Sequence, residues 1–219
     1  MRILIIDHGC CDHPHTRIHR LRKGLEAEGC TVAVCGPSSR HRLDEQPAGM
    51  FGIHLHDVAA GSRSFFAAVQ SGSPDAFLAA VATVPSRLLG LAREAARQTI
   101  AEAADSLNPD VIFVLHAGIL TDLAVETGAP VVVHVSANDL LAAEQRASLR
   151  RLVSAAIGSS TGIVAADSQV AERLCDTWTG GDPDALTRFE TWPADAADAP
   201  SRIASICRAA LTRRGEEFA

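Results

Sequence analysis

The ends of two apolar runs carry the side chains best placed to bind a ligand. His116 directly follows the run DVIFVL, and His134, Asn138 and Asp139 lie within or just after the run PVVVHV. Both runs have the continuous Val/Ile/Leu content of strands buried on both faces of a parallel sheet. Because open sheets of this kind bind ligands beyond the carboxyl ends of their strands, we predict a ligand site at this edge.

Three of these residues also have a purely structural interpretation. His116 suits a polar cap on its strand or on the following helix. His134 lies inside an apolar run, which is typical of a hydrogen-bonded core histidine. Asp139 is typical of the acid that the helix macrodipole favours in a first turn. The sequence leaves both interpretations open for all three.

Metal-ligating residue types gather in two places, but neither has the spacing of a known metal site. His54 and His56 share one face of a strand by alternation, which is also the pattern of a solvated face. The loop after the first strand is rich in ligand types, but it has no CxxC to combine with an HxxxH pair, the combination typical of structural zinc sites. Its candidates are Cys10, Cys11, His13, His15 and His19. We predict no metal site.

Strands alternate with helices along the whole sequence. The two central strands cover Asp110 to Leu115 and Pro130 to Val135. Further strands are predicted at Arg2 to Asp7, Thr31 to Cys35, Gly52 to Val58, Gly162 to Ala166 and Thr187 to Trp192. This alternation predicts one α/β domain: a single Rossmann-like, doubly wound, mainly parallel sheet of six or seven strands, with helices on both faces and strand 110–115 in its interior.

Helical periodicity and capping residues predict where the helices lie. Thr16 is the expected N-cap of a helix to about Glu28, Gly29 is its stop, and Ser168 is the expected N-cap of a helix reaching Trp178. Other helices are predicted at 75–84, 86–107, 140–157 and 201–214. Residues 38–50 read as an irregular loop, and 59–74 are left unassigned.

Composition narrows the class of protein. The chain has 219 residues, 47% hydrophobic content and a formal net charge of -6, which argue for one globular domain and against disorder or nonspecific nucleic-acid binding. No apolar run reaches membrane-spanning length, and no signal-peptide pattern follows the opening MRILIID. The six cysteines form no disulfide-framework spacing, so we expect reduced thiols and a cytoplasmic location.

The loop after the first strand bears on cofactors. It contains one glycine, Gly9, and lacks the GxGxxG spacing that lets a dinucleotide pyrophosphate approach the backbone, so NAD binding is not expected. The helix that follows carries Arg17, Arg20 and Arg22. These arginines either bind phosphate or form a solvated helix face.

The order of these motifs resembles a known family. RILIID, then HPHTRIHRLRKGLEAEGCTVAVCGP, NPDVIFVLHAG, APVVVHVSANDL and GIVAADSQVAERL, is similar to the N-terminal, acceptor-side domain of family 4 glycosyltransferases of the GT-B architecture. Gly29, Cys30 and Val32 stand at the family's Gly-His-x-Val turn, with Cys in the usual place of His. The resemblance covers roughly residues 1 to 178, and its motifs count as an ordered set because each alone is weak.

The resemblance implies a function and a set of site residues. It implies residues 1–195 as a glycosyltransferase N-terminal-type domain, and 196–219 as a linker and a helix that packs back on it. It implies sugar transfer with retention from a nucleotide-sugar donor, which is a co-substrate, and no further cofactor. His116 would be catalytic and Gly9 would approach the nucleotide. The implied acceptor-binding residues are His13, His15, Arg17, His134, Asn138 and Asp139.

This sequence departs from the family in two respects. The glycine pair that follows the first strand in many relatives is missing, since Cys10 and Cys11 occupy that loop. The segments of the donor-binding second domain, including its paired glutamates, have no counterpart here. The expected partners are therefore a small-molecule or glycan acceptor and a donor-binding domain or second chain, with no nucleic acid and no membrane span.

Two other classes of function stay open. The chain could be a noncatalytic or regulatory binding subunit that partners a separate donor-binding chain. It could also be a small-molecule or flavin-type binding fold. A phospho-acceptor receiver domain fits less well, because no second acid stands beside Asp7 and no lysine ends a late strand.

Overall fold

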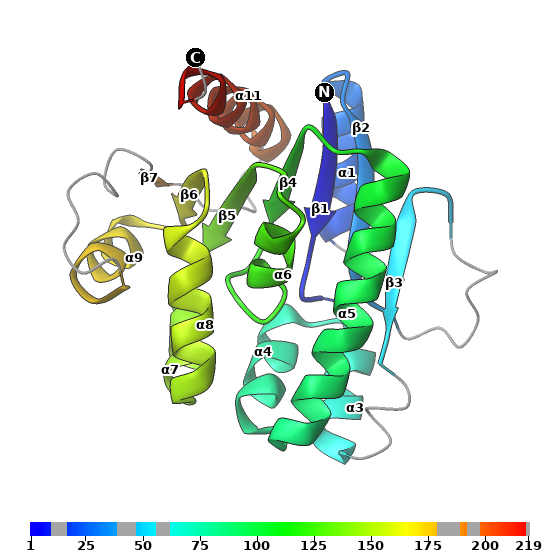
Figure 1. Cartoon of the computed structure of the whole chain (residues 1–219), viewed down its shortest axis with the longest axis vertical. Coiled ribbons are helices and arrows are strands. Elements are labelled where there is room, and N and C mark those ends of the chain that lie inside the picture. Colours follow the sequence, from blue (N-terminus) through cyan, green and yellow to red (C-terminus); the bar gives the residue numbers. More distant parts are fainter. Residues whose placement is uncertain (10–16, 39–46, 56–61, 179–188, 192–197, 218–219) are drawn as a thin grey trace.

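The fold is described from a computed structural model. The structure describes residues 1–9, 17–38, 47–55, 62–178, 189–191 and 198–217 (Figure 1). Among the described helices, none combines the length and the apolar character that crossing a membrane requires.

The described strands form one parallel sheet of seven strands in the order β3-β2-β1-β4-β5-β6-β7. Their bounds are β1 Arg2–Ile6, β2 Thr31–Ser38, β3 Met50–His54, β4 Val111–Val114, β5 Val131–Val135, β6 Gly162–Ala165 and β7 Phe189–Thr191. The prediction of a doubly wound parallel sheet with 110–115 inside is confirmed. Because the strand order reverses between β1 and β4, those two strands flank the point where such sheets bind ligands.

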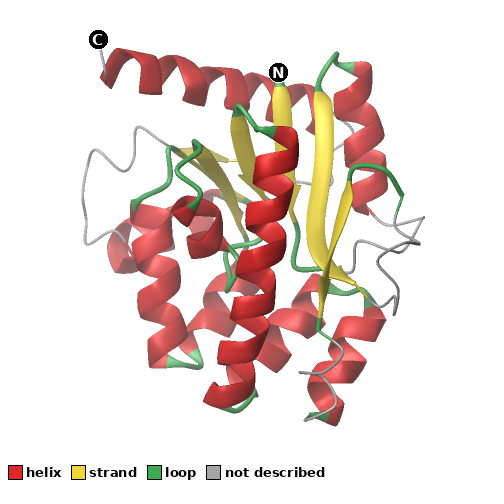
Figure 2. Cartoon of the chain, turned by 45° about the vertical axis from the view of Figure 1, so that its right-hand side comes forward, coloured by secondary structure: helices red, strands yellow, loops and turns green. Residues whose placement is uncertain are grey.

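Helices cover both faces of the sheet (Figure 2). Their bounds are α1 Arg17–Ala27, α3 Arg63–Ser71, α4 Pro74–Thr83, α5 Ser86–Leu107, α6 Thr121–Glu126, α7 Ala137–Glu144, α8 Ala147–Gly158, α9 Ser168–Arg173, the π-helical turn η2 Leu174–Trp178, and α11 Ala199–Glu217. Alternation along β1 sends Leu4 and Ile6 into the core beneath α5, and Ile3 and Ile5 into the core beneath α1 and α11.

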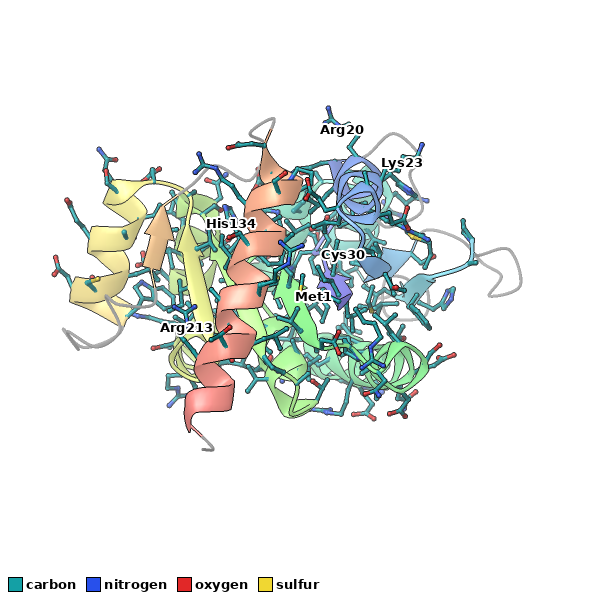
Figure 3. All side chains as sticks on the ribbon, turned by 90° about the horizontal axis from the view of Figure 1, so that it is seen from above. Met1, Arg20, Lys23, Cys30, His134 and Arg213 are labelled. Atoms are coloured by element: carbon teal, nitrogen blue, oxygen red, sulfur yellow. The ribbon has the colours of Figure 1, made fainter. Side chains whose placement is uncertain are left out.

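The last helix closes the second core. Ile203 and Cys207 of α11 are buried in the same cluster as Ile18 and Leu25 of α1. The two helices meet so closely that a Cβ on Gly24 would come 2.3 Å from Cγ of Pro200. Figure 3 shows the N-terminal part of α11 beside α1.

Within the described residues, two predicted strands differ from the structure by two or more residues at an end. β2 continues through Gly36 and Pro37 to Ser38, because β3 pairs with these residues after β1 has ended. β3 begins at Met50, not at Gly52, and the strand ends at His54. The rest of the predicted strand, from His56 to Val58, lies outside the described residues. Gly36 approaches β1 closely, since a Cβ there would lie 2.8 Å from the Asp7 carbonyl oxygen.

The single helix predicted over 140–157 is two helices, α7 and α8. The chain turns at Arg146, whose φ of -142° and ψ of 114° are extended, and its guanidinium donates to the carbonyl of Val84 and the hydroxyl of Ser86. These two hydrogen bonds, to residues at or just before the start of α5, stabilise the break between α7 and α8. Both helices bury apolar residues in the same core cluster, so the helical periodicity of the sequence did not predict the break between them.

Some predicted helix ends agree with the structure and others do not. The predicted helix 86–107 coincides with α5, and Gly29 follows α1 with φ +79° as expected of a stop. The N-cap of α9 is Asp167, not Ser168, because its carboxylate accepts from the Val170 N–H at 2.8 Å. Thr16 lies outside the described residues. Helix α3 fills part of the segment left unassigned.

Candidate functional site

His116 and Asp139 form a buried pair at the carboxyl edge of the sheet. His116 follows β4, and Asp139 lies in the first turn of α7, just after β5. Nδ1 of His116 is 3.1 Å from Oδ1 of Asp139. The other carboxylate oxygen accepts from the backbone N–H groups of Ala117 at 3.1 Å and Ser136 at 2.8 Å. The carboxylate therefore holds the imidazole with its Nδ1 proton inward, which leaves Nε2 to face outward.

His116 and Asp139 shift each other's pKa values. Burial by itself lowers the pKa of His116, but the hydrogen bond and the charge of Asp139, together with the charge of Asp7, raise that pKa overall above 6.5. Burial also raises the pKa of Asp139, yet the bond to His116, its charge and the Ser136 N–H lower it overall. Each partner thus stabilises the ionised form of the other.

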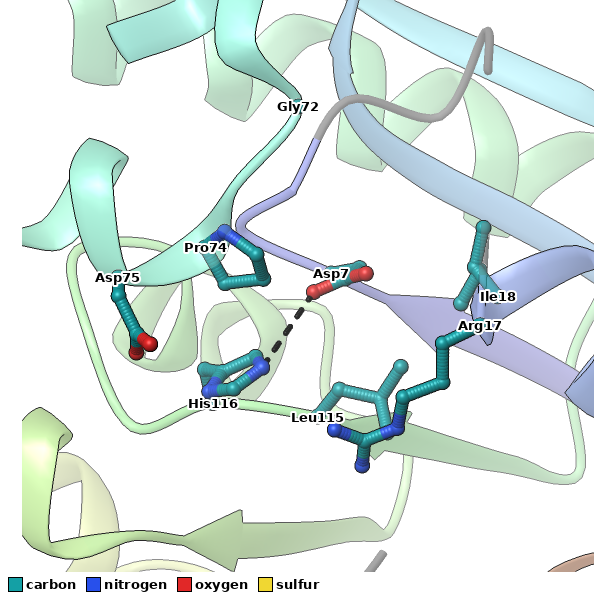
Figure 4. A pocket seen from close by; sticks show the side chains of 8 residues that line it. All are labelled: Asp7, Arg17, Ile18, Gly72, Pro74, Asp75, Leu115 and His116. Carbon is teal, nitrogen blue, oxygen red and sulfur yellow. Dashed lines mark ion pairs between the residues drawn. The ribbon is translucent and has the colours of Figure 1, made fainter. Parts of the chain in front are cut away.

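Asp7 stands on the other side of the strand-order reversal. It follows β1, and its Oδ1 is 3.8 Å from Nε2 of His116, which is beyond hydrogen-bond distance. The same oxygen accepts from the Gly9 N–H at 3.2 Å, which fixes the carboxylate. Figure 4 shows the Asp7 carboxylate facing the His116 ring. A small polar group of a ligand could therefore contact both the imidazole and the carboxylate.

These groups line a cavity of about 260 Å³. Its lining side chains combine one imidazole, one guanidinium and two carboxylates with apolar walls, from β1, α1, the α3–α4 turn and the end of β4 (Figure 4). The lining residues are Asp7, Arg17, Ile18, Gly72, Pro74, Asp75, Leu115 and His116. Mixed apolar walls with a few convergent polar groups are typical of a small-molecule site.

His8 supports the loop that carries His116, and the sequence interpretation overlooked it. Its Nε2 accepts from the Leu120 N–H at 3.2 Å, and its ring meets that of His116 edge-on at 6.4 Å. Burial first, and then the charge of His116, lower the pKa of His8 to about 3, so the ring stays neutral. Its position directly after the first strand was the available signal, the same one that identified His116.

The other predicted site residues differ in burial and in whether they line the cavity. Arg17 lines the cavity, whereas Asn138 is exposed on α7 and does not. His134 is buried within β5, where Nδ1 is 3.2 Å from the Leu115 carbonyl oxygen, and burial lowers its pKa to about 4. Gly9 is buried against the α3–α4 turn, since a Cβ there would come 2.9 Å from the Gly72 carbonyl oxygen.

The remaining candidates fall outside the described residues. These are His13 and His15 of the acceptor set and, with them, Cys10 and Cys11. Among the residues that the structure does describe, no group of three or more His, Cys, Asp or Glu side chains is arranged to hold a metal ion. The acceptor-binding roles of His13 and His15 remain predictions.

Comparison with known proteins gives similarity in structure only. No family model and no curated protein sequence matches the chain. A glycosyltransferase of Streptomyces sp. SF2575 with thymidine diphosphate has 14% identity and a TM-score of 0.40 over 75% of this chain and 48% of its own. A UDP-GlcNAc 2-epimerase from Neisseria meningitidis bound to UDP-GlcNAc has 14% identity and a TM-score of 0.45 over 87% and 45%.

A third solved structure is the spinosyn rhamnosyltransferase, with 13% identity and a TM-score of 0.39 over 76% of this chain and 45% of its own. The chain thus spans about half the length of each of these three structures. Likeness at this level assigns no activity, so any function has to be argued from the site itself.

Proposed function

We propose that this chain is the acceptor-binding half of a GT-B-type glycosyltransferase in which His116 activates the acceptor hydroxyl. The observation that carries the proposal is the His116–Asp139 pair, whose free Nε2 borders a cavity between the ends of β1 and β4. The ordered motifs that resemble the acceptor-side domain of family 4 enzymes lend support to the sugar-transfer chemistry.

In this proposal His116 works as a general base. Its Nε2 takes the proton of the acceptor hydroxyl as that oxygen bonds to the anomeric carbon of the donor sugar. The bond from that carbon to the diphosphate oxygen breaks, and the nucleoside diphosphate leaves with the electron pair. Asp139 keeps its charge and stabilises the imidazolium that forms, as the acid of a catalytic triad does.

The donor needs a site of its own. A nucleoside diphosphate carries concentrated negative charge, which calls for backbone N–H groups at a glycine-rich helix start or for clustered cations. The loop after β1 lacks paired glycines. We infer that a second Rossmann-like domain, in the same chain or as a second subunit, supplies the donor site, and that residues 1 to 219 alone bind nucleotide sugars weakly.

The test is His116→Gln in the chain assembled with its donor-binding domain or partner chain. We expect turnover to fall by roughly 10²–10⁴-fold, the usual contribution of a positioned base, in a protein whose melting curve shows that it remains folded at the assay temperature. His54→Gln, on β3 and away from the cavity, is the matched control. A folded His116→Gln protein with normal turnover would favour the noncatalytic binding subunit instead.

The pH profile gives a second test of the same role. Because the pKa of His116 is raised, kcat/KM should rise with pH to a midpoint above 6.5. Asp139→Asn removes the charge that raises the pKa, so the midpoint should move to lower pH while the rate falls. A midpoint that ignores Asp139→Asn would mean that another group is the base.

A further inference from the structure

Arg17 presents a buried cationic surface to the cavity. It is the first residue of α1, and its side chain reaches the cavity beside Leu115 (Figure 4). Its Nε and Nη2 atoms are inaccessible to solvent and have no hydrogen-bond acceptor in the described part of the chain. These two atoms form one edge of the planar guanidinium, the edge that binds carboxylate or phosphate with two parallel hydrogen bonds.

Two other partly buried arginines have protein acceptors, whereas Arg213 has a single nitrogen, Nε, without one in the described part of the chain. Arg93 donates to the carboxylate of Asp122 and to the carbonyl of Ile119. Arg146 donates to the carbonyl of Val84 and to the hydroxyl of Ser86. A buried guanidinium edge without such acceptors is unfavourable, because its N–H groups have lost water and gained nothing in return. The unpaired edge of Arg17 is therefore suited to a ligand that brings its own acceptors.

The charges around the cavity indicate where an anion would bind. Asp75 and Arg17 lie on opposite sides of His116 (Figure 4). Asp75 is exposed in the first turn of α4, and the Asp7 carboxylate already accepts from the Gly9 N–H. Asp75 repels an anion and Arg17 attracts one. The anionic group of a ligand is therefore expected at Arg17, with the rest of the ligand extending toward His116.

We propose, on the basis of the proposed function, that the acceptor is an anionic hydroxy compound whose phosphate or carboxylate binds Nε and Nη2 of Arg17 while its hydroxyl reaches His116. Both anions match the guanidinium edge, and the cavity of about 260 Å³ limits the bound part to a small molecule or one terminal unit of a larger one. Arg17 then selects the acceptor, and His116 acts on it.

Binding at Arg17 also acts on the base. Burial is the largest influence that lowers the pKa of His116, and the positive charge of Arg17 acts in the same direction against the raising effects of Asp139 and Asp7. An anion on Arg17 offsets that positive charge, so the imidazole gains proton affinity when the acceptor is bound. Recognition of the anion thereby strengthens the base that acts on the hydroxyl.

The first experiment measures anion binding without turnover. Inorganic phosphate and acetate are titrated into the full chain while NMR follows the His116 imidazole. Arg17→Gln should raise the Kd roughly tenfold or more, because it loses a charge-assisted pair of hydrogen bonds. Arg20→Gln is the matched control, since Arg20 is exposed on the same helix. The stronger of the two probes identifies the acceptor anion as phosphate or carboxylate.

Two results would overturn the proposal: no binding of either probe to the wild-type chain, or equal binding by Arg17→Gln. In wild type the bound anion should also raise the pKa of His116 in the NMR titration. His116→Gln, for which calorimetry replaces the His116 signal, should keep anion binding, which separates the two proposals. If it keeps both binding and turnover, the general-base function fails while the anion site stands.

A stability measurement keeps the proposal testable should anion binding be hard to detect. In anion-free buffer, Arg17→Met should raise the Tm, by roughly 2–4 °C if the unpaired charge is as unfavourable as such groups usually are. A lower Tm than wild type would mean that Arg17 has a structural partner, and the assignment of its free edge to a ligand would be wrong.

Discussion

The two edges of the sheet treat their charged residues in opposite ways. At the amino edge, Asp110 accepts from the backbone N–H of Arg2 at 2.7 Å and from its guanidinium at 2.8 Å. The two side chains are 42% and 32% exposed. At the carboxyl edge, the side chains of His116 and Asp139 are 9% and 0% exposed, and they are hydrogen-bonded to each other inside the protein.

The difference in burial sets the carboxyl edge apart from the amino edge. Exposed ion pairs contribute little and can be exchanged for other surface residues. Buried charges and buried donors are unfavourable unless they are paired, either within the fold or with a ligand. The carboxyl edge has both, in Asp139 with His116 and in the free edge of Arg17. His116 and Asp139 satisfy each other within the fold, whereas the free edge of Arg17 has no acceptor in the described part of the chain, which supports our proposal of a ligand there.

The largest effect should come from removing the buried carboxylate. Asp139→Ala leaves the His116 imidazole and the Ala117 and Ser136 N–H groups without their acceptor and removes the capping box of α7. We expect the free energy of unfolding to fall by about 3–5 kcal/mol, the usual loss when one member of a buried pair is removed. Denaturant unfolding at pH 7 measures it.

Asp105→Ala is the control for this change, because Asp105 is exposed on α5 and its loss should stay within about 0.5 kcal/mol. Asp139→Asn should fall between the two, since an amide oxygen still accepts one bond. Equal unfolding free energies for Asp139→Ala and wild type would mean that the pair is solvated and that the contrast between the edges is wrong.

The sequence predicted the scaffold better than the contacts within the site. The runs ending at Leu115 and Val135 are apolar throughout, so their burial and parallel pairing followed from composition. The partnership of His116 with Asp139 spans 23 positions and depends on α7 starting at Ala137, which periodicity placed later. The capping-box spacing from Ser136 to Asp139 was the local signal for that start.

His8 and Arg17 show why the rest could not be predicted. The burial of His8 depends on Phe77 and on the loop of His116, which arrive from distant parts of the chain. A helix carrying three arginines is usually solvated, and only the packing of Arg17 against Leu115 and the cavity distinguishes it from Arg20. Long-range packing, which no local pattern encodes, decides both.

The next effect is a loss of stability in acid. The unfolded chain protonates its histidines near pH 6.5, whereas folded His134 and His8 resist protonation down to about 4 and about 3. Stability present above pH 6.5 should therefore fall as the pH drops toward 4, by up to about 1.4 kcal/mol per pH unit for each ring. The raised pKa of His116 acts oppositely, adding stability below 6.5 that is lost as the pH rises.

Unfolding free energies measured from pH 7 to pH 4.5 test this, and His8→Phe isolates one ring. The substitution should flatten the slope even if it lowers stability at every pH, because the slope counts protons and not contacts. A wild-type slope that His8→Phe leaves unaltered would show that His8 is protonated or solvated in the folded chain.

A smaller effect is expected from crowding the loop at the carboxyl edge. In Gly118→Ala the new Cβ would come 2.5 Å from Nε2 of His8 and 2.6 Å from Cδ2 of Leu78. Relieving that contact displaces the ring that holds the loop of His116, so we expect a loss of about 1–3 kcal/mol, measured by denaturant unfolding. Gly90→Ala in α5 meets nothing within 4 Å and should instead gain up to about 1 kcal/mol.

The smallest effect should lie at the amino edge, where Arg2→Ala breaks the ion pair with Asp110. Both side chains are partly exposed and Asp110 keeps its bond from the backbone N–H of residue 2, so the loss should be about 0.2–1 kcal/mol. Salt screens such pairs, so the difference between Arg2→Ala and wild type should shrink between 0.05 and 1 M sodium chloride, by roughly half or more. The loss in Asp139→Ala should persist in the same salt series, because its pair is closed off from solvent. If the two losses respond alike to salt, the His116–Asp139 pair is as accessible to solvent as the Arg2–Asp110 pair. The contrast in burial between the two edges would then no longer support a ligand site at the carboxyl edge.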